Sequence, residues 1–253
     1  MSDNKQVVLI TGASRGIGLG IAKIYASEGS TLILTEISER YLDLKVVAEE
    51  LRKEFNVNIK ILEIDIRNLS EIKDKISLLK DEYSKITTLI NNAGINIIKD
   101  SLEVCEDDWN RVSDINLKGT FFMTQQVVKN MIKNDIRGSI INIASQHGVV
   151  GNINRAVYCA TKAGIINMTR ALSYEWAKYG IRVNCVSPTY VETKNNTNYL
   201  NSSKGKRDYL NKIPLKIYAK PEDIGNACKF LSSLDSKLIT GQNIIIDGGY
   251  TSI

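Results

Sequence analysis

Short apolar runs alternate along the chain with longer stretches of helical spacing. The runs predict seven strands, at Val7–Thr11, Thr31–Thr35, Ile59–Ile64, Thr88–Asn91, Ser139–Ala144, Arg182–Val186 and Asn243–Ile246. The amphipathic stretches predict helices at Gly18–Glu28, Tyr41–Phe55, Glu71–Tyr83, Glu106–Val112, Leu117–Lys133, Ala156–Lys178 and Glu222–Ser232. Because continuous apolar strands are typical of parallel sheets buried on both faces, the pattern predicts an α/β fold. We expect a doubly wound parallel sheet of the Rossmann type, with helices on both faces.

Residues 189–215 interrupt this alternation. The segment follows Pro188 and is polar, rich in Asn, Ser and Lys. Long irregular segments in compact domains are usually functional or mobile, and this one follows a strand end, where such sheets bind ligands. We interpret it as a substrate lid; the alternative is a solvated insertion. No linker or internal repeat divides the chain, so residues 1–253 are expected to form a single domain.

Composition restricts the class of protein. The 253 residues are 43% hydrophobic and carry a net charge of +5, which is ordinary for a globular protein. No apolar run approaches the ~20 residues that cross a bilayer, and Met1–Lys5 lacks the apolar stretch of a signal peptide. We therefore expect a cytoplasmic protein with no membrane or nucleic-acid partner. Four isolated cysteines and one histidine make a metal site improbable, and none is expected.

A glycine-rich turn separates the first predicted strand from the first helix. Gly12, Gly16 and Gly18 allow positive φ and a close backbone approach to a pyrophosphate, which the helix N-terminus then binds. Glu36 ends the second strand, where a carboxylate binds the adenosine ribose hydroxyls and repels a 2′-phosphate. Arg15, in the glycine-rich turn, favours NADP instead, because a basic residue there can contact the 2′-phosphate. Glu36 predicts NAD as the cofactor, with NADP the less favoured alternative.

A tyrosine and a lysine lie four residues apart in the long predicted helix. Tyr158 and Lys162 therefore share one face of that helix. A nearby ammonium lowers the pKa of a tyrosine, so Tyr158 is expected to exchange a proton with a substrate oxygen near neutral pH. Ser145 closes the fifth strand and can hold the same oxygen. Such a Tyr–Lys pair alone is common on exposed helix faces.

Together these residues resemble the short-chain dehydrogenase/reductase family over essentially the whole chain. The matching pieces are Thr11–Gly18, Asp65-Ile66, Asn91-Asn92-Ala93-Gly94, Asn116, Ser145, Tyr158 with Lys162, Pro188 with Thr193, and Asp247-Gly248-Gly249. The resemblance implies an NAD(P)-dependent oxidoreductase that interconverts a secondary alcohol and a ketone. It implies a catalytic tetrad of Asn116, Ser145, Tyr158 and Lys162, in which Tyr158 is the general acid/base and Asn116 holds a relay water. Lys162 would bind the nicotinamide ribose and lower the pKa of Tyr158.

The resemblance also implies the cofactor-binding residues. They are Gly12, Ser14, Arg15, Ile17, Gly18, Glu36, Asp65, Ile66, Asn92, Ala93, Gly94, Tyr158, Lys162, Pro188, Val191 and Thr193. Asp65 and Ile66 would face the adenine, and Val191 and Thr193 the carboxamide. The family usually has Pro-Gly where this chain has Pro188-Thr189, which narrows the space beside the nicotinamide.

The substrate is expected to be a small polar hydroxy or keto compound. Gln146, His147, Asn152 and Arg155 are candidate contacts, although His147 can equally be a surface residue or one that supports a contacting residue. The segment from Lys194 to Lys216 carries six basic residues and one acid, Asp208, which favours a polar or anionic substrate over a steroid. We expect a sugar, polyol or sugar acid. The alternatives are a 3-oxoacyl-(acyl-carrier-protein) reductase and a cofactor-sensing protein without turnover.

The resemblance implies a homotetramer, in which the long helix forms one contact between subunits and the last strand forms another. Small or apolar residues on more than one side of the long helix, at Ala163, Ile166, Ala171 and Trp176, favour a second partner for it. The apolar end at Tyr250 and Ile253 favours a second contact, and two separate two-fold axes give a closed tetramer.

Overall fold

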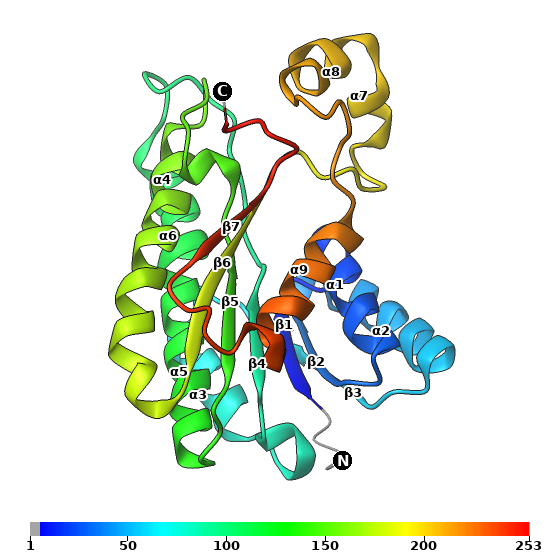
Figure 1. Ribbon diagram of the computed structural model, residues 1–253, viewed down its shortest axis with the longest axis vertical. Coiled ribbons are helices and arrows are strands. Elements are labelled where there is room, and N and C mark those ends of the chain that lie inside the picture. Colours follow the sequence, from blue (N-terminus) through cyan, green and yellow to red (C-terminus); the bar gives the residue numbers. More distant parts are fainter. Residues whose placement is uncertain (1–5, 253) are drawn as a thin grey trace.

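Seven parallel strands form one sheet, in the order β3-β2-β1-β4-β5-β6-β7 (Figure 1). This computed structural model describes residues 6–252, so the predictions about Met1–Lys5 and Ile253 lie outside the described residues. The strands are β1 (Val7–Thr11), β2 (Thr31–Glu36), β3 (Ile59–Glu63), β4 (Thr88–Asn91), β5 (Ser139–Ile143), β6 (Arg182–Pro188) and β7 (Asn243–Ile246). The predicted Rossmann-type α/β fold is confirmed, because every strand pair is parallel.

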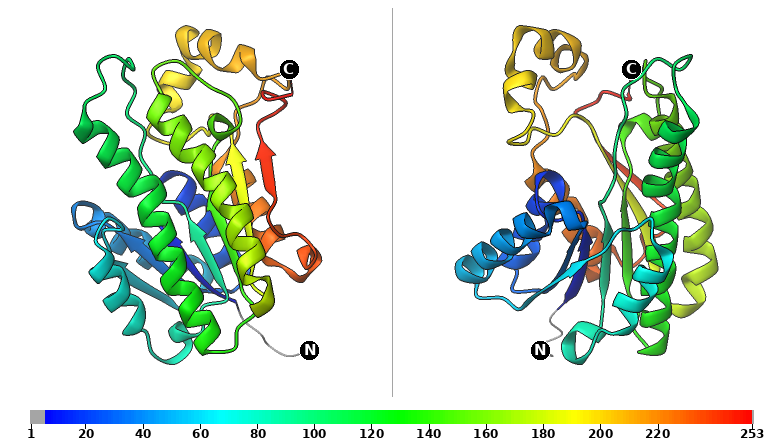
Figure 2. Two further views of the ribbon diagram at one scale, coloured as in Figure 1. Left: turned by 90° about the vertical axis from the view of Figure 1, so that its left-hand side faces the viewer. Right: turned by 180° about the vertical axis from the view of Figure 1, so that it is seen from behind.

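Helices cover both faces of this sheet (Figures 1 and 2). On one face lie α1 (Gly16–Ser27), α2 (Tyr41–Phe55) and α9 (Pro221–Ser232). On the other lie α3 (Leu69–Ser77), α4 (Glu106–Ser113), α5 (Thr120–Lys133) and α6 (Ala156–Trp176). Two short helices, α7 (Thr197–Asn201) and α8 (Ser203–Asp208), lie apart from both layers, beyond the C-terminal ends of the strands (Figure 1).

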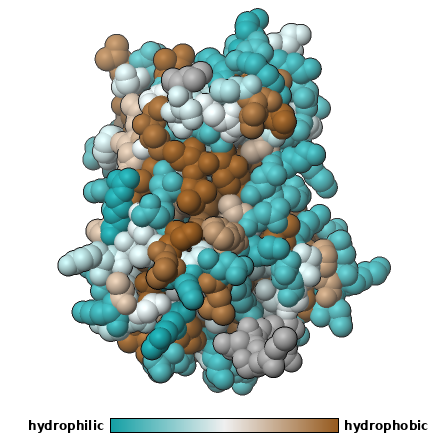
Figure 3. Space-filling view, in the orientation of Figure 1, coloured by the Kyte–Doolittle hydropathy of each residue, from teal (hydrophilic) through white to brown (hydrophobic). Residues whose placement is uncertain are grey.

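The last strand leaves apolar side chains exposed. β7 ends the sheet, and Ile245 is 37% exposed while Leu234 and Leu238, which precede the strand, are 86% and 90% exposed. Figure 3 shows hydrophobic residues gathered over the middle of the face on which β7 lies in Figure 1. An apolar area of this kind often marks a contact with another molecule.

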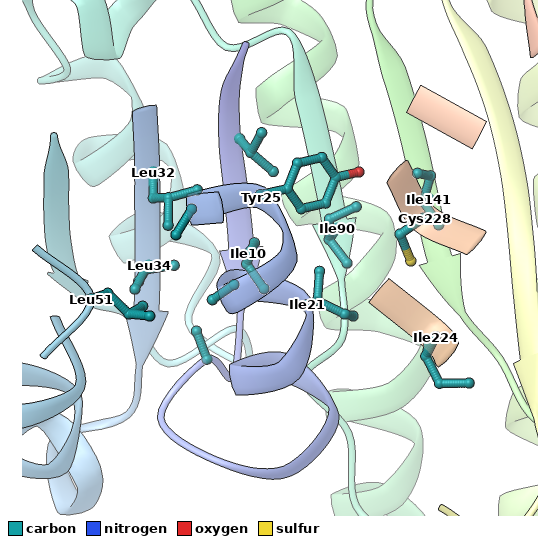
Figure 4. Packing of buried hydrophobic residues seen from close by; sticks show 14 of the residues in the cluster. Ile10, Ile21, Tyr25, Leu32, Leu34, Leu51, Ile90, Ile141, Ile224 and Cys228 are labelled. Atoms are coloured by element: carbon teal, nitrogen blue, oxygen red, sulfur yellow. The ribbon is translucent and has the colours of Figure 1, made fainter. Parts of the chain in front are cut away.

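The helices are held to the sheet by alternate side chains of the strands. Figure 4 shows Ile10 of β1 among Ile21 and Tyr25 of α1, and Leu34 of β2 beside Leu51 of α2. The hydroxyl of the fully buried Tyr25 lies 2.8 Å from Ser232 Oγ of α9, so the one polar atom of this ring is also paired. The alternate residues of the same strands, such as Leu9, pack with the methionines and valines of α5 on the other face. Burial on both faces explains why the strands read as continuous apolar runs.

Strand predictions agree with the structure to within two residues, but several helix ends do not. The helix predicted at Glu71–Tyr83 stops at Ser77, and Asp81 then adopts a positive φ of 52° before a separate short 3-10 turn. The helix predicted at Leu117–Lys133 begins at Thr120, after a π-helical turn at Asp114–Gly119. The long helix ends at Trp176, in a 3-10 turn that Gly180 closes with φ 69°.

The segment expected to be an irregular lid contains regular structure. Besides α7 and α8 it has its own small core, in which Leu200, Ile213 and Tyr218 are buried. This core explains how a polar segment keeps a defined shape beyond the sheet. Among residues 6–252 no helix has the length and apolar character needed to span a bilayer, and no group of His, Cys, Asp and Glu could hold a metal ion.

Candidate active site

A cavity of about 700 Å³ runs along the C-terminal ends of the strands. It lies at the ends of the neighbouring strands β1 and β4, where the strand order reverses, which is the switch point at which doubly wound sheets bind nucleotides. Fifteen of the expected residues line it: Gly12, Arg15, Ile17, Glu36, Asp65, Ile66, Asn92, Ala93, Gly94, Ser145, Tyr158, Lys162, Pro188, Val191 and Thr193. Ser14, Gly18 and Asn116 do not line it, and each supports a neighbouring residue instead.

The glycine turn has the shape that a dinucleotide requires. Gly12 adopts a φ of 66°, and a Cβ added to Gly18 would lie 2.2 Å from the carbonyl oxygen of Gly12. Only glycine at position 18 lets α1 start this close to β1. Asn92 Nδ2 donates to the carbonyls of Thr11 and Gly12, at 2.9 Å each, and so fixes the turn from β4. No side chain caps the N-terminus of α1, which leaves its amides available to phosphate oxygens.

Two arginines and one glutamate define the adenosine end. Glu36 is buried, and its Oε1 accepts a hydrogen bond from Ser14 Oγ at 2.8 Å while its Oε2 accepts one from the amide of Ile37. Ser14 therefore orients the carboxylate. Arg15 lines the same wall, and burial and the charge of Arg40 lower its pKa. The residues fit a nucleotide ribose, and the carboxylate is held where it would face the hydroxyls.

Asp65 is engaged by a neighbouring arginine. The guanidinium of Arg67 bonds both carboxylate oxygens, and this pairing holds the pKa of Asp65 below its usual value. The buried Ile66 beside it offers an apolar wall for a base. At this position the cavity wall therefore offers a carboxylate of fixed orientation, from Asp65, and an apolar surface, from Ile66.

The reactive side chains meet at the ends of β5 and α6. Ser145 follows β5 and is buried, and its hydroxyl is close enough to that of Tyr158 to lower the tyrosine pKa by hydrogen bonding. Lys162, one turn further along α6, is also buried; its Nζ donates to the carbonyl of Ile143 at 2.7 Å and lies 5.7 Å from the centre of the Tyr158 ring. The predicted grouping of Ser145, Tyr158 and Lys162 is present in one wall of the cavity.

The expected lowering of the Tyr158 pKa by Lys162 is wrong for this arrangement. Burial is the largest effect and raises the pKa of Tyr158, and the bond from Ser145 offsets only part of the rise. Burial also lowers the pKa of Lys162 to about 8. The ammonium donates to a carbonyl rather than to the phenol oxygen, so its charge stabilises the phenolate less than its place on the helix suggested.

Asn116 lies in the π-helical turn and is fully buried. Its Oδ1 accepts from the amide of Ile95 at 2.8 Å, and its Nδ2 donates to the Ile95 carbonyl and to Thr161 Oγ1. The side chain thus ties the loop after β4 to α6, close to Lys162. Its role as the holder of a relay water remains a prediction.

None of the four candidate substrate residues lines the cavity, and two of them, His147 and Asn152, are linked to Ser145 by hydrogen bonds. The amide of His147 donates to Ser145 Oγ at 3.1 Å, and Asn152 Nδ2 lies 3.2 Å from His147 Nε2 and 3.3 Å from the hydroxyl of Tyr190. Arg155 reaches from the start of α6 to the hydroxyl of Tyr209 in the lid segment. His147 is buried, so its alternative interpretation as a surface residue does not hold.

Several residues that line the cavity belong to no recognised motif and were not predicted from the sequence. They are Ile37, Glu39, Arg40, Arg67, Asn96, Arg111, Asn195 and Asn196. In the sequence, these residues are marked as candidates for the cavity only by lying close to motif residues along the chain. Thr189 stands where the family usually has glycine, and its amide continues the sheet ladder by donating to the Ile246 carbonyl at 2.9 Å.

The sole histidine offers a test of this environment. Burial and the charge of Arg155 lower the His147 pKa to about 4, below the ~6.5 of an exposed imidazole. The unfolded chain then binds more protons between these values, so His147 makes stability fall as pH drops from about 6.5 to about 4. In melting curves across this range, His147→Gln should show a weaker loss of Tm than the parent. Equal slopes would contradict a neutral buried imidazole.

The chain is similar in sequence to known oxidoreductases over almost its whole length. The sequence model of a family described as enoyl-(acyl carrier protein) reductase matches residues 12–251. An NAD-dependent glycerol dehydrogenase of Listeria innocua is 35% identical, over 97% of this chain and 94% of the relative. A 3-oxoacyl-(acyl-carrier-protein) reductase of Thermotoga maritima is 39% identical, over 96% of this chain and 97% of the relative.

A solved structure is similar over the same length. A proposed 2-deoxy-D-gluconate 3-dehydrogenase from Agrobacterium tumefaciens, crystallised with NADP, superposes with a TM-score of 0.85 at 32% identity, over 98% of this chain and 97% of that one. The chain belongs to the short-chain dehydrogenase/reductase family. It is an NAD(P)-dependent oxidoreductase, as the sequence predicted.

Proposed function

We propose that the protein interconverts a secondary alcohol and a ketone on a polar sugar, polyol or sugar-acid substrate, with NAD as the preferred cofactor. The observation that carries the substrate class is a cluster of buried polar atoms that lack hydrogen-bond partners. Among the described residues five such side-chain atoms occur, and four belong to Gln146, His147 and Thr189, which follow the adjacent strands β5 and β6. Buried polar groups normally have partners. A polyhydroxylated substrate next to Ser145 supplies both donors and acceptors.

The chemistry follows from three side chains. In oxidation, the carbinol hydroxyl gives its proton to the phenolate of Tyr158 while the carbon–hydrogen bond breaks; in reduction, the phenol returns that proton to the ketone oxygen. Ser145 donates to the same substrate oxygen and fixes it beside Tyr158. Lys162 lies in the same wall of the cavity, where its ammonium would bind the ribose of the nicotinamide cofactor. When bound along the cavity, the nicotinamide cofactor accepts or supplies the hydride.

The proposed NAD preference rests on Glu36. The parent enzyme should show a higher kcat/KM with NAD than with NADP, and Glu36→Ala should reduce that ratio by about 10- to 100-fold, the effect of losing a hydrogen bond to a charged group. Glu39→Ala removes a neighbouring acid of the same cavity wall and serves as the control, with a smaller change expected. A parent enzyme that prefers NADP would show that Arg15 and Arg40 dominate the site.

A second candidate function is reduction of a 3-oxoacyl group on an acyl carrier protein, which the Thermotoga maritima relative favours. A panel of polyols, sugars and sugar acids, followed by NADH absorbance, tests the first proposal, and acetoacetyl thioesters with NADPH test the second. We expect turnover in the first panel; turnover of the thioesters alone would replace it. A non-catalytic sensing role is disfavoured, because binding alone does not require the arrangement of Ser145, Tyr158 and Lys162.

We also propose a homotetramer. On α6, Ala163 and Ala171 are exposed as the proposal needs, and Tyr174 is 89% exposed. Ile166 is buried and therefore belongs to the core rather than to an interface. The exposed apolar residues around β7 supply the second contact. Light scattering should give four times the 28.2 kDa chain mass, and a stable monomer would contradict the proposal.

A further inference from the structure

Arg155 is a buried cation with no acidic partner among residues 6–252. It is 9% exposed, and it takes part in none of the ion pairs between described residues. Its Nη1 donates to the carbonyl of Ile153 at 3.2 Å, and its Nη2 reaches the hydroxyl of Tyr209 at 3.5 Å, the limit of a hydrogen bond. A guanidinium offers five donors, and burying one without a counter-charge is costly.

The surroundings of Arg155 are neutral and close to the reacting groups. The rings of Tyr190 and Tyr209 lie 4.2 Å apart beside it, and burial raises the pKa of Tyr190, so this wall carries no negative charge. The charge of Arg155 is felt at Tyr158, whose pKa it lowers, and at His147. Arg155 directly precedes α6 and lies three residues before Tyr158, and its effect on the Tyr158 pKa places the guanidinium near the reacting phenol.

We infer that Arg155 binds a carboxylate of the substrate, which displaces the weak contact with Tyr209, so that the enzyme acts on hydroxy and keto acids rather than on neutral polyols. The inference rests on the proposed function and narrows its substrate class. A carboxylate matches the guanidinium fork with two parallel bonds and neutralises its single charge. A phosphate dianion would leave a net negative charge buried beside this one cation.

Matched pairs of probes test the inference. The pairs are D-gluconate with D-glucitol, D-galactonate with D-galactitol, and D-glycerate with glycerol, each measured for kcat/KM with NAD. We expect the acid to exceed its neutral partner, and Arg155→Met to reduce this ratio by about 10²-fold, as when one partner of a buried charge pair is removed. Arg207→Met removes the same charge from the exposed surface of the lid and should leave the ratio unchanged. A parent enzyme that prefers the neutral member, or an unchanged ratio in Arg155→Met, overturns the inference.

Binding is measured separately, so that the inference and the proposed function can fail independently. With NADH present, the three acids should raise the Tm of the parent and of Arg207→Met but not that of Arg155→Met. An equal rise in Arg155→Met overturns the inference even if some acid is oxidised. Acids that bind through Arg155 without being oxidised would support the carboxylate site and refute the proposed reaction. Replacing an unpaired buried cation by an apolar side chain of similar length should not lower Tm in the absence of acid.

Discussion

Tyr158→Phe should bind NADH about as well as the parent enzyme and lose about 10²–10⁴-fold in turnover, the usual cost of removing a positioned proton donor. The phenol oxygen is the group beside Ser145 that can exchange a proton with a substrate oxygen. The ring itself, which shapes the cavity wall, is retained in the variant. Turnover is measured by NADH absorbance, and NADH binding by fluorescence titration.

Tyr179→Phe is the matched control, because Tyr179 follows the same helix at its far end and is 41% exposed. It should keep the activity of the parent. Near-normal turnover in Tyr158→Phe would remove the acid/base role of Tyr158. A loss of NADH affinity equal to the loss of rate would show that the phenol acts in binding rather than in proton transfer.

Lys162→Met should lose both turnover and cofactor affinity. The buried Nζ of Lys162 lines the cavity wall between Ile143 and Gly94, so its charge acts on the site as a whole. A fall of about 10²-fold in kcat/KM is expected, because the variant removes a charged hydrogen-bond donor from the wall of the cofactor cavity. Lys178→Met, beyond the end of α6, is the control and should change neither quantity.

The pKa of Lys162 predicts that NADH affinity depends on pH. Burial lowers this pKa to about 8, so the ammonium is present below pH 8 and is lost as pH rises through that value. NADH affinity of the parent should therefore fall between about pH 7 and pH 9, and that of Lys162→Met should be flat in the same range. An identical pH profile in both proteins would show that Lys162 does not provide the charge.

The strands could be predicted from the sequence because each is an apolar run buried on two faces. An apolar run such as Val7–Thr11 is stable in a globular protein when both of its faces are covered, as in a central strand of a parallel sheet. Helix ends were less predictable, because the positive φ of Asp81 and the π turn around Asn116 depend on contacts made across the fold. The helical content of the lid was missed, since its core comes from a few apolar residues in a polar segment.

The parts of the cavity that are formed by recognised motifs could be predicted from the sequence. Gly12, Glu36, Tyr158 and Lys162 all line it as expected. Arg40 was missed because a turn residue four positions beyond a strand has no spacing that marks it. The direction of the Tyr158 pKa was also missed, because burial and the bond from Lys162 to a carbonyl appear only after folding. That Arg155 has no acidic partner among residues 6–252 is likewise a property of the folded chain.

Hydride transfer to a polar keto compound can be tested in a single competition experiment. NADH deuterated at the transferring position is mixed with the enzyme, a set of keto sugars and keto acids, and an equal concentration of acetoacetyl thioester. Mass spectrometry then measures deuterium in each product, and the product ratio gives the ratio of kcat/KM values. We predict deuterium on the carbinol carbon of a sugar, polyol or sugar-acid product. Deuterium found mainly in the hydroxybutyryl thioester, or in no product, would contradict the account.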